Sequence, residues 1–193
     1  MAQWKGILMP VIAQTCRLTL RTWRRGDRTL FNRHCNTAAV MQHLGEVQSD
    51  HDVDEDVAWF KHCSSEFGHT LWVVERTEDE EFLGFAGLDM LDRECTGVPA
   101  NLHGEIEIGR RLREDAWGKG YATEAAIVCL DIAFRVRRFA RVVSRAEVEN
   151  GASIAIMEKL EMTPSTRFKP EEGGVLYEID RPTWFAESCK GYR

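Results

Sequence analysis

The segment that decides the fold reads Leu112-Arg113-Glu114-Asp115-Ala116-Trp117-Gly118-Lys119-Gly120-Tyr121-Ala122-Thr123-Glu124-Ala125. Its first residues close an alternating stretch typical of a strand, and the apolar residues after Gly118 recur at helical spacing. Glycine lets the backbone turn tightly and lets an anion approach without a side chain in the way. The loop amides and the N-terminus of the following helix then point to one spot, which predicts an anion-binding turn between a strand and a helix.

Two common phosphate-binding motifs are absent from this segment. No Gly-Lys-Ser/Thr follows at the spacing of a P-loop. The dinucleotide fingerprint is incomplete, because Gly118 and Gly120 are followed by Thr123 where its third glycine belongs. A glycine pair alone is a weak signal, so the rest of the chain has to decide what the loop binds.

The patterns on either side of the loop predict one α/β (or α+β) domain with a mixed sheet. Alternation and β-rich composition predict strands at 17–23, 70–75, 82–91, 102–112, 140–146 and 174–180. Helices are expected at 27–43, from the acidic stretch at 50–56 onward, at 118–134 and at 150–160, with Asp27 and Asn150 as N-caps. Because no repeat or linker divides the chain, we expect an N-terminal extension at 1–13, one domain at 14–185 and a tail at 186–193.

Composition limits the function classes. The 193 residues are 44% hydrophobic and 29% charged, which is typical of an ordinary globular domain. A net charge of -6 argues against nucleic-acid binding and mildly favours cationic partners. The apolar run at 7–13 is too short to span a membrane and makes a poor secretion signal. Six scattered cysteines without a C-x-x-C pair predict no disulfide framework and no metal site, and fit a reducing cytoplasm.

Three motifs, taken in order, resemble the GNAT superfamily of acetyltransferases. The stretch 117–125 is similar to that family's R/Q-x-x-G-x-G/A loop, with tryptophan in the leading position as in the ribosomal-protein N-terminal (alanine/serine) acetyltransferases. Upstream, Glu107-Ile108-Gly109 resembles the E-I-G of that branch. Downstream, Asn150-Gly151-Ala152-Ser153 and Met157-Glu158-Lys159-Leu160 resemble its N-x-x-S and E-K-L-G. The resemblance spans about residues 15–184, and three motifs at the right spacing are more specific than one.

The resemblance implies a fold and an activity. The fold would be a mixed, mostly antiparallel sheet that is splayed at the cofactor site and flanked by helices. The activity would be transfer of an acetyl group from acetyl-CoA, without a metal, to a primary amine of a protein N-terminus or a small molecule. The amine would attack directly in a ternary complex, in a cytoplasmic monomer or homodimer.

The resemblance also assigns cofactor-binding residues. The backbone of Arg110 and Leu112 would pair with the pantetheine arm. The pyrophosphate would be held by the amides of Gly118, Lys119, Gly120, Ala122 and Thr123. Trp117 is expected either to pack beneath the loop or to flank the cofactor, and packing is favoured.

Two residues are candidates for proton transfer. Glu107 is the candidate base, because the resembling branch has a glutamate there. Alternation places Glu105 and Glu107 on one face of their strand, which is either the reaction cleft or a solvated surface. Ser153 is expected to protonate the leaving thiolate or simply to cap a helix. Asn150 is expected to contact the cofactor or to cap the same helix.

Two positions depart from the family pattern. Many members place a tyrosine acid on the helix after Asn150, and the residue in register here is Met157. The glycine that follows E-K-L in the family is Glu161 here, where a left-handed helix end would be strained. The tyrosine acid therefore has no counterpart at this position, and the helix is expected to end differently from that of the family.

Other readings stay open. The chain could be a CoA-binding sensor or regulatory module with weak catalysis, or a transferase for another acyl-CoA. Fold resemblance does not fix the acceptor. The expected mouth of the cleft is acidic, which predicts a cationic acceptor whose KM rises with salt. The alternative is that these carboxylates only solubilise helix starts and a loop. The residues are Asp50, Asp52, Asp54, Glu171 and Glu172.

Overall fold

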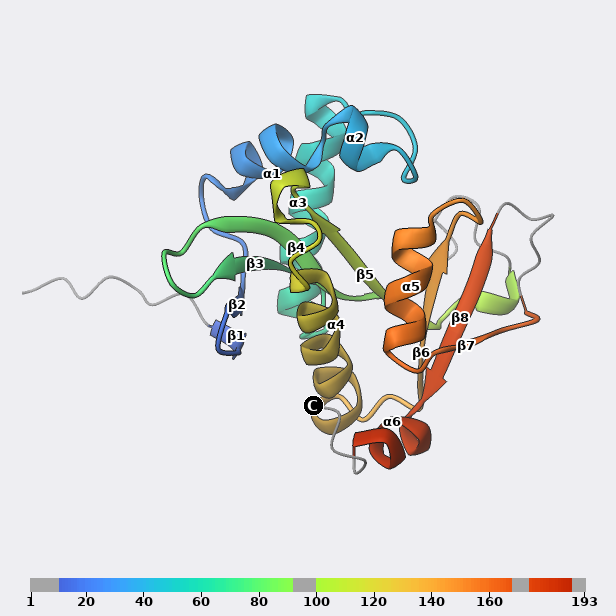
Figure 1. Ribbon diagram of the computed structural model, residues 1–193. Helices are drawn as coiled ribbons and strands as arrows, with labels where there is room; N and C mark the ends of the chain where they lie inside the picture. Colours follow the sequence, from blue (N-terminus) through green and yellow to red (C-terminus); the bar gives the residue numbers. More distant parts are fainter. Residues whose placement is uncertain (1–10, 92–99, 168–173, 189–193) are drawn as a thin grey trace, which may run out of the picture.

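The computed structural model describes residues 11–91, 100–167 and 174–188, and the expected loop residues Gly97, Pro99, Glu171 and Glu172 lie outside these ranges. An eight-stranded sheet with the order β1-β2-β3-β4-β5-β6-β8-β7 forms the centre (Figure 1). Every neighbouring pair is antiparallel except β5 and β6, which are parallel. The expected mixed, mostly antiparallel sheet with flanking helices is therefore confirmed.

The elements follow the predicted order. The strands are Val11–Gln14 (β1), Leu18–Arg21 (β2), Leu71–Arg76 (β3), Phe82–Met90 (β4), Ile106–Leu112 (β5), Arg141–Ala146 (β6), Thr163–Pro164 (β7) and Val175–Asp180 (β8). The α-helices are Asp27–Cys35 (α1), Ala38–Met41 (α2), Asp50–Glu66 (α3), Tyr121–Asp131 (α4), Gly151–Lys159 (α5) and Arg181–Ser188 (α6). Short 3₁₀ turns lie at Ala100–Leu102 (η1) and Glu114–Ala116 (η2), and a π-helical turn follows α4 at Ile132–Val136 (η3).

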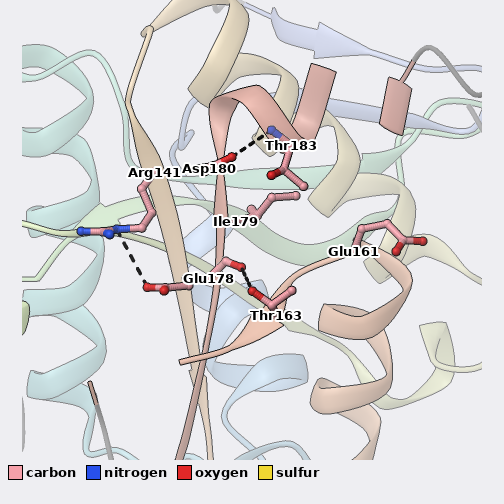
Figure 2. Close-up of a pocket in the computed structure, with 7 residues that line it drawn as sticks. All are labelled: Arg141, Glu161, Thr163, Glu178, Ile179, Asp180 and Thr183. Atoms are coloured by element: carbon pink, nitrogen blue, oxygen red, sulfur yellow. Dashed lines mark hydrogen bonds and ion pairs between the residues drawn. The ribbon is translucent and has the colours of Figure 1, made fainter. Parts of the chain in front are cut away.

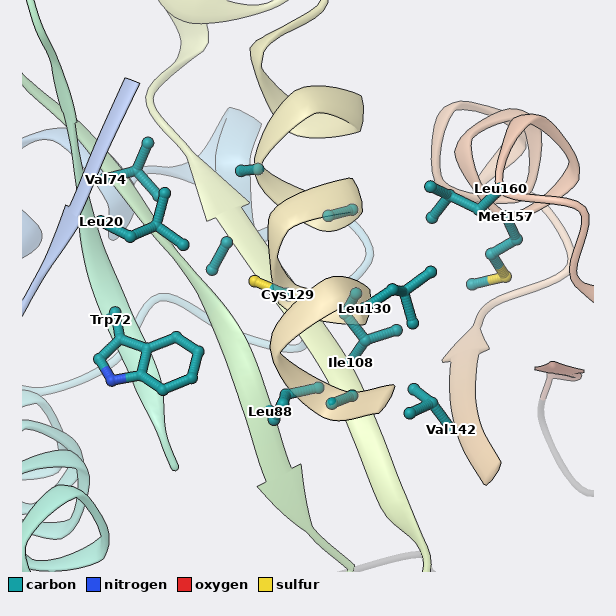
Figure 3. Close-up of a cluster of buried hydrophobic side chains, with 14 of the residues drawn as sticks. Leu20, Trp72, Val74, Leu88, Ile108, Cys129, Leu130, Val142, Met157 and Leu160 are labelled. Atoms are coloured by element: carbon teal, nitrogen blue, oxygen red, sulfur yellow. The ribbon is translucent and has the colours of Figure 1, made fainter. Parts of the chain in front are cut away.

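Two cores lie on opposite faces of the sheet. The larger one packs α4 and α5 against one face, and Figure 3 shows Leu130 of α4 and Met157 of α5 beside Ile108 and Val142 of the sheet. The smaller one packs α1 and α3 against the other face around Trp23, Phe31, Phe60 and Phe85. Because side chains alternate along a strand, even-numbered residues of β5 face the α4–α5 side and odd-numbered residues face the α1–α3 side.

The start of the first helix corrects one expectation. Gly26, in the left-handed conformation with φ 101°, holds the N-cap position without a side-chain cap, so Asp27 is not the N-cap. The Asp27 carboxylate instead accepts hydrogen bonds from the Arg21 guanidinium at 2.7 and 2.9 Å and from the Arg24 amide. Arg21 is only 2% exposed. Leaving a buried guanidinium without a counterion costs more free energy than leaving a helix N-terminus without a side-chain cap, so Asp27 pairs with Arg21.

The expected helix over 27–43 is broken in two. Helix α1 ends at Cys35, and Thr37 starts α2 by accepting a hydrogen bond on its hydroxyl from the Val40 amide. Asn36 between them bonds both Asn32 and the backbone of Gln48, which fixes the loop leading to α3. The interruption follows from a competing N-cap inside the predicted helix.

Both ends of the chain contain elements that the sequence patterns missed. Strand β1 pairs with β2 at the sheet edge, so the sheet takes in residues 11–13 of the expected N-terminal extension. Helix α6 runs to residue 188, beyond the expected domain end at 185. Trp184 of α6 is fully buried in the larger core, which accounts for the helix packing here.

Candidate active site

Strands β5 and β6 separate soon after they meet. Their parallel ladder registers one pair, Glu107 with Val143, and the Ser144 hydroxyl adds a bond to the Ile108 carbonyl at 3.3 Å. On its other side, β5 forms its backbone hydrogen bonds to β4 through odd-numbered residues. The bonds at the two ends of this ladder show the phase, since the Leu91 amide donates to the Glu105 carbonyl and the Arg113 amide donates to the Leu83 carbonyl. The backbone groups of Arg110 and Leu112 therefore point toward the gap beside β6.

The loop that follows β5 has the backbone that an anion site needs. Gly118 has φ 72° and Gly120 has φ 81°, in the left-handed region that favours glycine, and α4 begins directly afterwards at Tyr121. A Cβ added at Gly118 would meet nothing within 4 Å, so the loop is open on that side. The amides of the loop and of the first turn of α4 fit a phosphate group.

The Trp117 side chain satisfies one backbone carbonyl at the edge of β5. Its indole Nε1 donates a hydrogen bond to the Leu112 carbonyl at 2.9 Å. The side chain stays 48% exposed, contrary to the expectation that it packs beneath the loop. Along this edge, the Leu112 amide and both backbone groups of Arg110 point into the gap beside β6.

Arg17 is a site residue that the sequence analysis missed. It comes from the turn between β1 and β2, donates to the Lys119 carbonyl at 3.0 Å and to Glu124 of α4 at 2.7 Å, and lies 5.0 Å from the centre of the Tyr121 ring. Its guanidinium would be 3.5 Å from a Cβ on Gly120. It therefore ties the glycine loop to the turn between β1 and β2, with its charge paired to the Glu124 carboxylate.

The start of α5 lies across the gap from β5. Asn150 is the N-cap, as expected, since its side chain accepts a hydrogen bond from the Ser153 amide at 3.0 Å. Arg110 reaches across and donates from Nη2 to both the hydroxyl and the carbonyl of Ser153, each at 3.0 Å. Burial lowers the pKa of Arg110 to about 10. Met157 is fully buried in the core, so the position of the family's tyrosine is filled by packing.

Glu105 and Glu107 share the α1–α3 face, as alternation predicts, and both are engaged by arginines. Arg145 of β6 contacts Glu107 with its backbone amide and its Nε, each at 3.1 Å. Arg141 and Arg167 contact Glu105 at 2.7 and 2.6 Å. Burial alone would raise the pKa of Glu105, but the hydrogen bonds from the two arginines lower it. Neither carboxylate is a freely solvated surface group.

Further polar contacts connect this face to the segments around it. Arg111 of β5 lies over the rings of Phe31 and Phe85 and donates to the Gln48 side chain at 2.9 Å. His43, just after α2, lies 2.9 Å from Glu147, just after β6. The segments before α3 and before α5 thus meet at one end of the separated strands.

Three of the acidic residues expected at the mouth of the cleft form ion pairs or a helix cap at the start of α3. Arg28 contacts Asp50 at 2.9 Å and Asp54 at 2.8 Å. Asp52 completes a capping box with Ser49. These contacts neutralise or occupy the three carboxylates, so the described part of the chain favours the structural explanation for them over attraction of a cation.

Two surface hollows open at the other end of β6. One of about 150 Å³ is drawn in Figure 2 and lined by Arg141, Glu161, Thr163, Glu178, Ile179, Asp180 and Thr183. The second, of about 450 Å³, includes Glu105, Phe139 and Arg141. Neither contains a residue of the glycine loop, because both lie where β6 begins and the loop follows the end of β5.

Three features of the described residues bear on other chemistries, namely metal-binding groups, membrane-spanning helices and the two most buried cysteines. They contain no group of three or more His, Cys, Asp or Glu side chains that could hold a metal ion, and no helix long and apolar enough to cross a membrane. Cys35 and Cys129 are fully buried, and burial raises the pKa of each thiol to about 12. These thiols are not suited to act as nucleophiles.

The separated strands and the glycine loop define an acyltransferase of the GNAT type. The chain matches the acetyltransferase (GNAT) domain over residues 17–163 and belongs to that family. A relative is the uncharacterized protein YkkB of Bacillus subtilis (strain 168), which is 32% identical over 151 residues, 77% of this chain and 83% of YkkB.

Solved structures share the fold. An acetyltransferase from Agrobacterium tumefaciens str. C58 has a TM-score of 0.75 at 23% identity, covering 93% of this chain and 99% of that one. The spermidine N-acetyltransferase of Vibrio cholerae, solved with CoA and spermine, has a TM-score of 0.67 at 19% identity, covering 89% and 99%. The expected family and its acyltransferase activity are confirmed.

Proposed function

We propose that the chain transfers an acetyl group from acetyl-CoA to a primary amine of a small molecule or a protein N-terminus. The observation that carries the proposal is the continuity of two features. The edge of β5 that offers the Arg110 backbone and the Leu112 amide leads directly into the glycine loop at the start of α4. A strand edge suits an amide-bearing arm, and the loop suits a pyrophosphate.

Each binding group has a defined part in the proposal. The amides of Gly118, Lys119, Gly120, Ala122 and Thr123 would hold the pyrophosphate, with the charge of Lys119 and Arg17 beside them. The Arg110 and Leu112 backbone would align the pantetheine arm. Asn150 would contact the same arm from its capping position on α5. The bound donor supplies an activated acetyl group as a thioester.

The reaction requires two proton movements. The amine nitrogen bonds to the carbonyl carbon, the carbon–sulfur bond breaks, the nitrogen loses one proton and the sulfur gains one. Glu107 would accept the first proton through a water molecule, because Arg145 occupies its carboxylate oxygens. Ser153 would donate the second, with the Arg110 guanidinium 3.0 Å from its hydroxyl to stabilise the negative charge. The Arg110 amide would donate to the thioester carbonyl oxygen, which leaves the Arg110 carbonyl and the Leu112 amide for the rest of the pantetheine arm.

Two observations favour a second candidate, a CoA-binding module with weak catalysis. The position of the usual tyrosine acid is the buried Met157, and the candidate base is held in an ion pair. Such a module would bind acetyl-CoA without releasing its thiol in the presence of amines.

A screen of amine acceptors separates the two candidates. Thiol release from acetyl-CoA is followed with spermidine, amino acids, short peptides and aminoglycosides, and mass spectrometry identifies the acetylated product. Propionyl-CoA and succinyl-CoA test the acyl donor in parallel. Turnover with at least one amine supports the transferase. A thermal shift with acetyl-CoA but no thiol release across the panel would replace it with the binding module.

A further inference from the structure

Arg111 differs from the other arginines on its face of the sheet. Arg141, Arg145 and Arg167 each contact a carboxylate within 3.1 Å. Arg111 forms no ion pair with any described residue, and the Gln48 side chain accepts its single side-chain hydrogen bond. Arg111 lies near the end of β5, with its guanidinium over the Phe31 ring of α1.

The guanidinium is nevertheless held in place. Its central carbon lies 5.4 Å from the Phe31 ring centre and 5.3 Å from that of Phe85. Gln48 fixes one Nη1 hydrogen and is itself bound to Asp56 through its amide group. Burial lowers the pKa of Arg111, because a desolvated cation lacks the stabilisation of water. Keeping an unpaired guanidinium half-buried is costly unless something pairs with it.

One edge of this guanidinium, formed by Nε and Nη2, is available to a ligand. Its Nε and Nη2 groups donate to no described residue. Among the described residues, the fully buried side-chain polar atoms that lack a partner are Arg21 Nε and Thr22 Oγ1, so Nε and Nη2 of Arg111 are at least partly accessible to solvent. A planar guanidinium with adjacent free N–H groups matches the two oxygens of a carboxylate.

Arg111 shares its face with the candidate base. Glu107 and Arg111 both have odd numbers on β5, and only Gly109 lies between them on that face. At about 3.3 Å per residue their Cα atoms are roughly 13 Å apart. Gly109 itself has no side chain, and the Leu71 side chain lies over this position, 3.1 Å from where a Cβ would be, so an acceptor that joins the two charges would pass over Leu71.

We infer that Arg111 binds a carboxylate of the acceptor, so that the substrate is an amine that also carries a carboxylate several bonds away. The inference rests on the proposed function, with the amine at Glu107. Because an extended chain covers at most about 3.3–3.6 Å per residue, an acceptor of two to four residues fits the separation. Short peptides or long amino acids are therefore favoured over a free α-amino acid and over a polyamine.

Matched pairs of peptides test the inference. Alanine and its di-, tri- and tetrapeptides are compared as free acids and as C-terminal amides, with thiol release measured for each. The free acids of the longer peptides are expected to have the lower KM. Arg111→Met should raise the KM of the acids about tenfold to a hundredfold, the range for a charge-assisted hydrogen bond, and leave the amides unchanged. Arg135→Met is the control, since Arg135 is an exposed arginine in η3, the turn that follows α4.

A binding measurement keeps the two proposals apart. Calorimetry of tripeptide acid against tripeptide amide, with CoA present, needs no turnover. Equal affinity for acid and amide, or no binding of either, overturns the role of Arg111. Turnover with amines that is indifferent to the carboxylate overturns this inference and leaves the transferase intact. If Arg111→Met fails to fold, Arg111→Lys retains the charge and is expected to lose part of the acid preference.

Discussion

Arg145 donates hydrogen bonds to both carboxylate oxygens of Glu107. The backbone amide and Nε of Arg145 contact Oε1 at 3.1 Å each, and Nη2 contacts Oε2 at 3.2 Å. The contact spans β5 and β6 at the last residues before the strands separate. It fixes the direction of the carboxylate and joins the two walls of the proposed cleft.

Replacing Glu107 by glutamine should lower turnover at saturating amine by about 10²–10⁴-fold, because the shape remains and the base is lost. The thermal shift caused by acetyl-CoA should stay close to that of the unchanged protein. Glu105→Gln is the matched control on the same face, and its turnover should change little. Undiminished turnover of Glu107→Gln across pH would move the role of base to another group or to solvent.

The glycine loop can be tested without any acceptor. Gly120→Asp adds a charge that repels phosphate and a side chain at φ 81°, so most of the acetyl-CoA thermal shift should disappear. In the unchanged protein, cofactor at a hundred times Kd should stabilise the fold by about 2.7 kcal/mol. Gly45→Asp is the control, since Gly45 has φ 101° and open space around it. A full shift in Gly120→Asp would place the cofactor elsewhere.

The sequence predicts the elements better than it predicts the contacts between them. The glycine loop, the hairpin of β3 and β4 and the cap at Asn150 depend on neighbours in the chain, and the structure contains all three. Arg17 and Arg111 depend on partners far away in sequence, Lys119 for one and Gln48 for the other. No local pattern distinguishes them from ordinary surface arginines.

The same limit accounts for Asp27. An aspartate before a helical pattern is a good N-cap by local rules. The partner that overrides the rule is the buried Arg21 on β2, which also contacts Glu75 on β3. Pairing of β2 with β3 creates that need, so it is visible only in the folded chain.

Glu105 predicts an acid-sensitive contribution to stability. Its pKa lies below the ordinary value of 4.5 in the folded state, because hydrogen bonds from Arg141 and Arg167 outweigh the effect of burial. The unfolded chain then binds the proton first, and the contribution is present above pH 4.5 and lost as the pH falls through the folded pKa. Urea unfolding between pH 6 and pH 3 should show a shallower loss of stability for Glu105→Gln. An identical slope in both proteins would contradict this assignment.

The end of α5 gives a prediction about stability alone. Glu161 has φ 58°, and the bonds from the Glu161 amide to the Glu158 carbonyl and from the Met162 amide to the Met157 carbonyl complete a Schellman motif. The helix therefore ends as a glycine would end it, with a side chain in a strained conformation. Glu161→Gly should raise the free energy of unfolding by roughly 0.5–1 kcal/mol.

The control for Glu161→Gly is the same substitution three residues earlier. Glu158 lies inside α5, where glycine costs about 0.8–1 kcal/mol relative to alanine, so Glu158→Gly should destabilise the protein. Opposite signs from the same substitution would show that glycine suits the left-handed position and not the helix interior, with the contact of Glu158 to Tyr177 adding to the loss in Glu158→Gly. Urea unfolding of the two variants measures the difference. Destabilisation by Glu161→Gly of the size found for Glu158→Gly would mean that the Glu161 side chain stabilises the fold by more than its backbone strain costs.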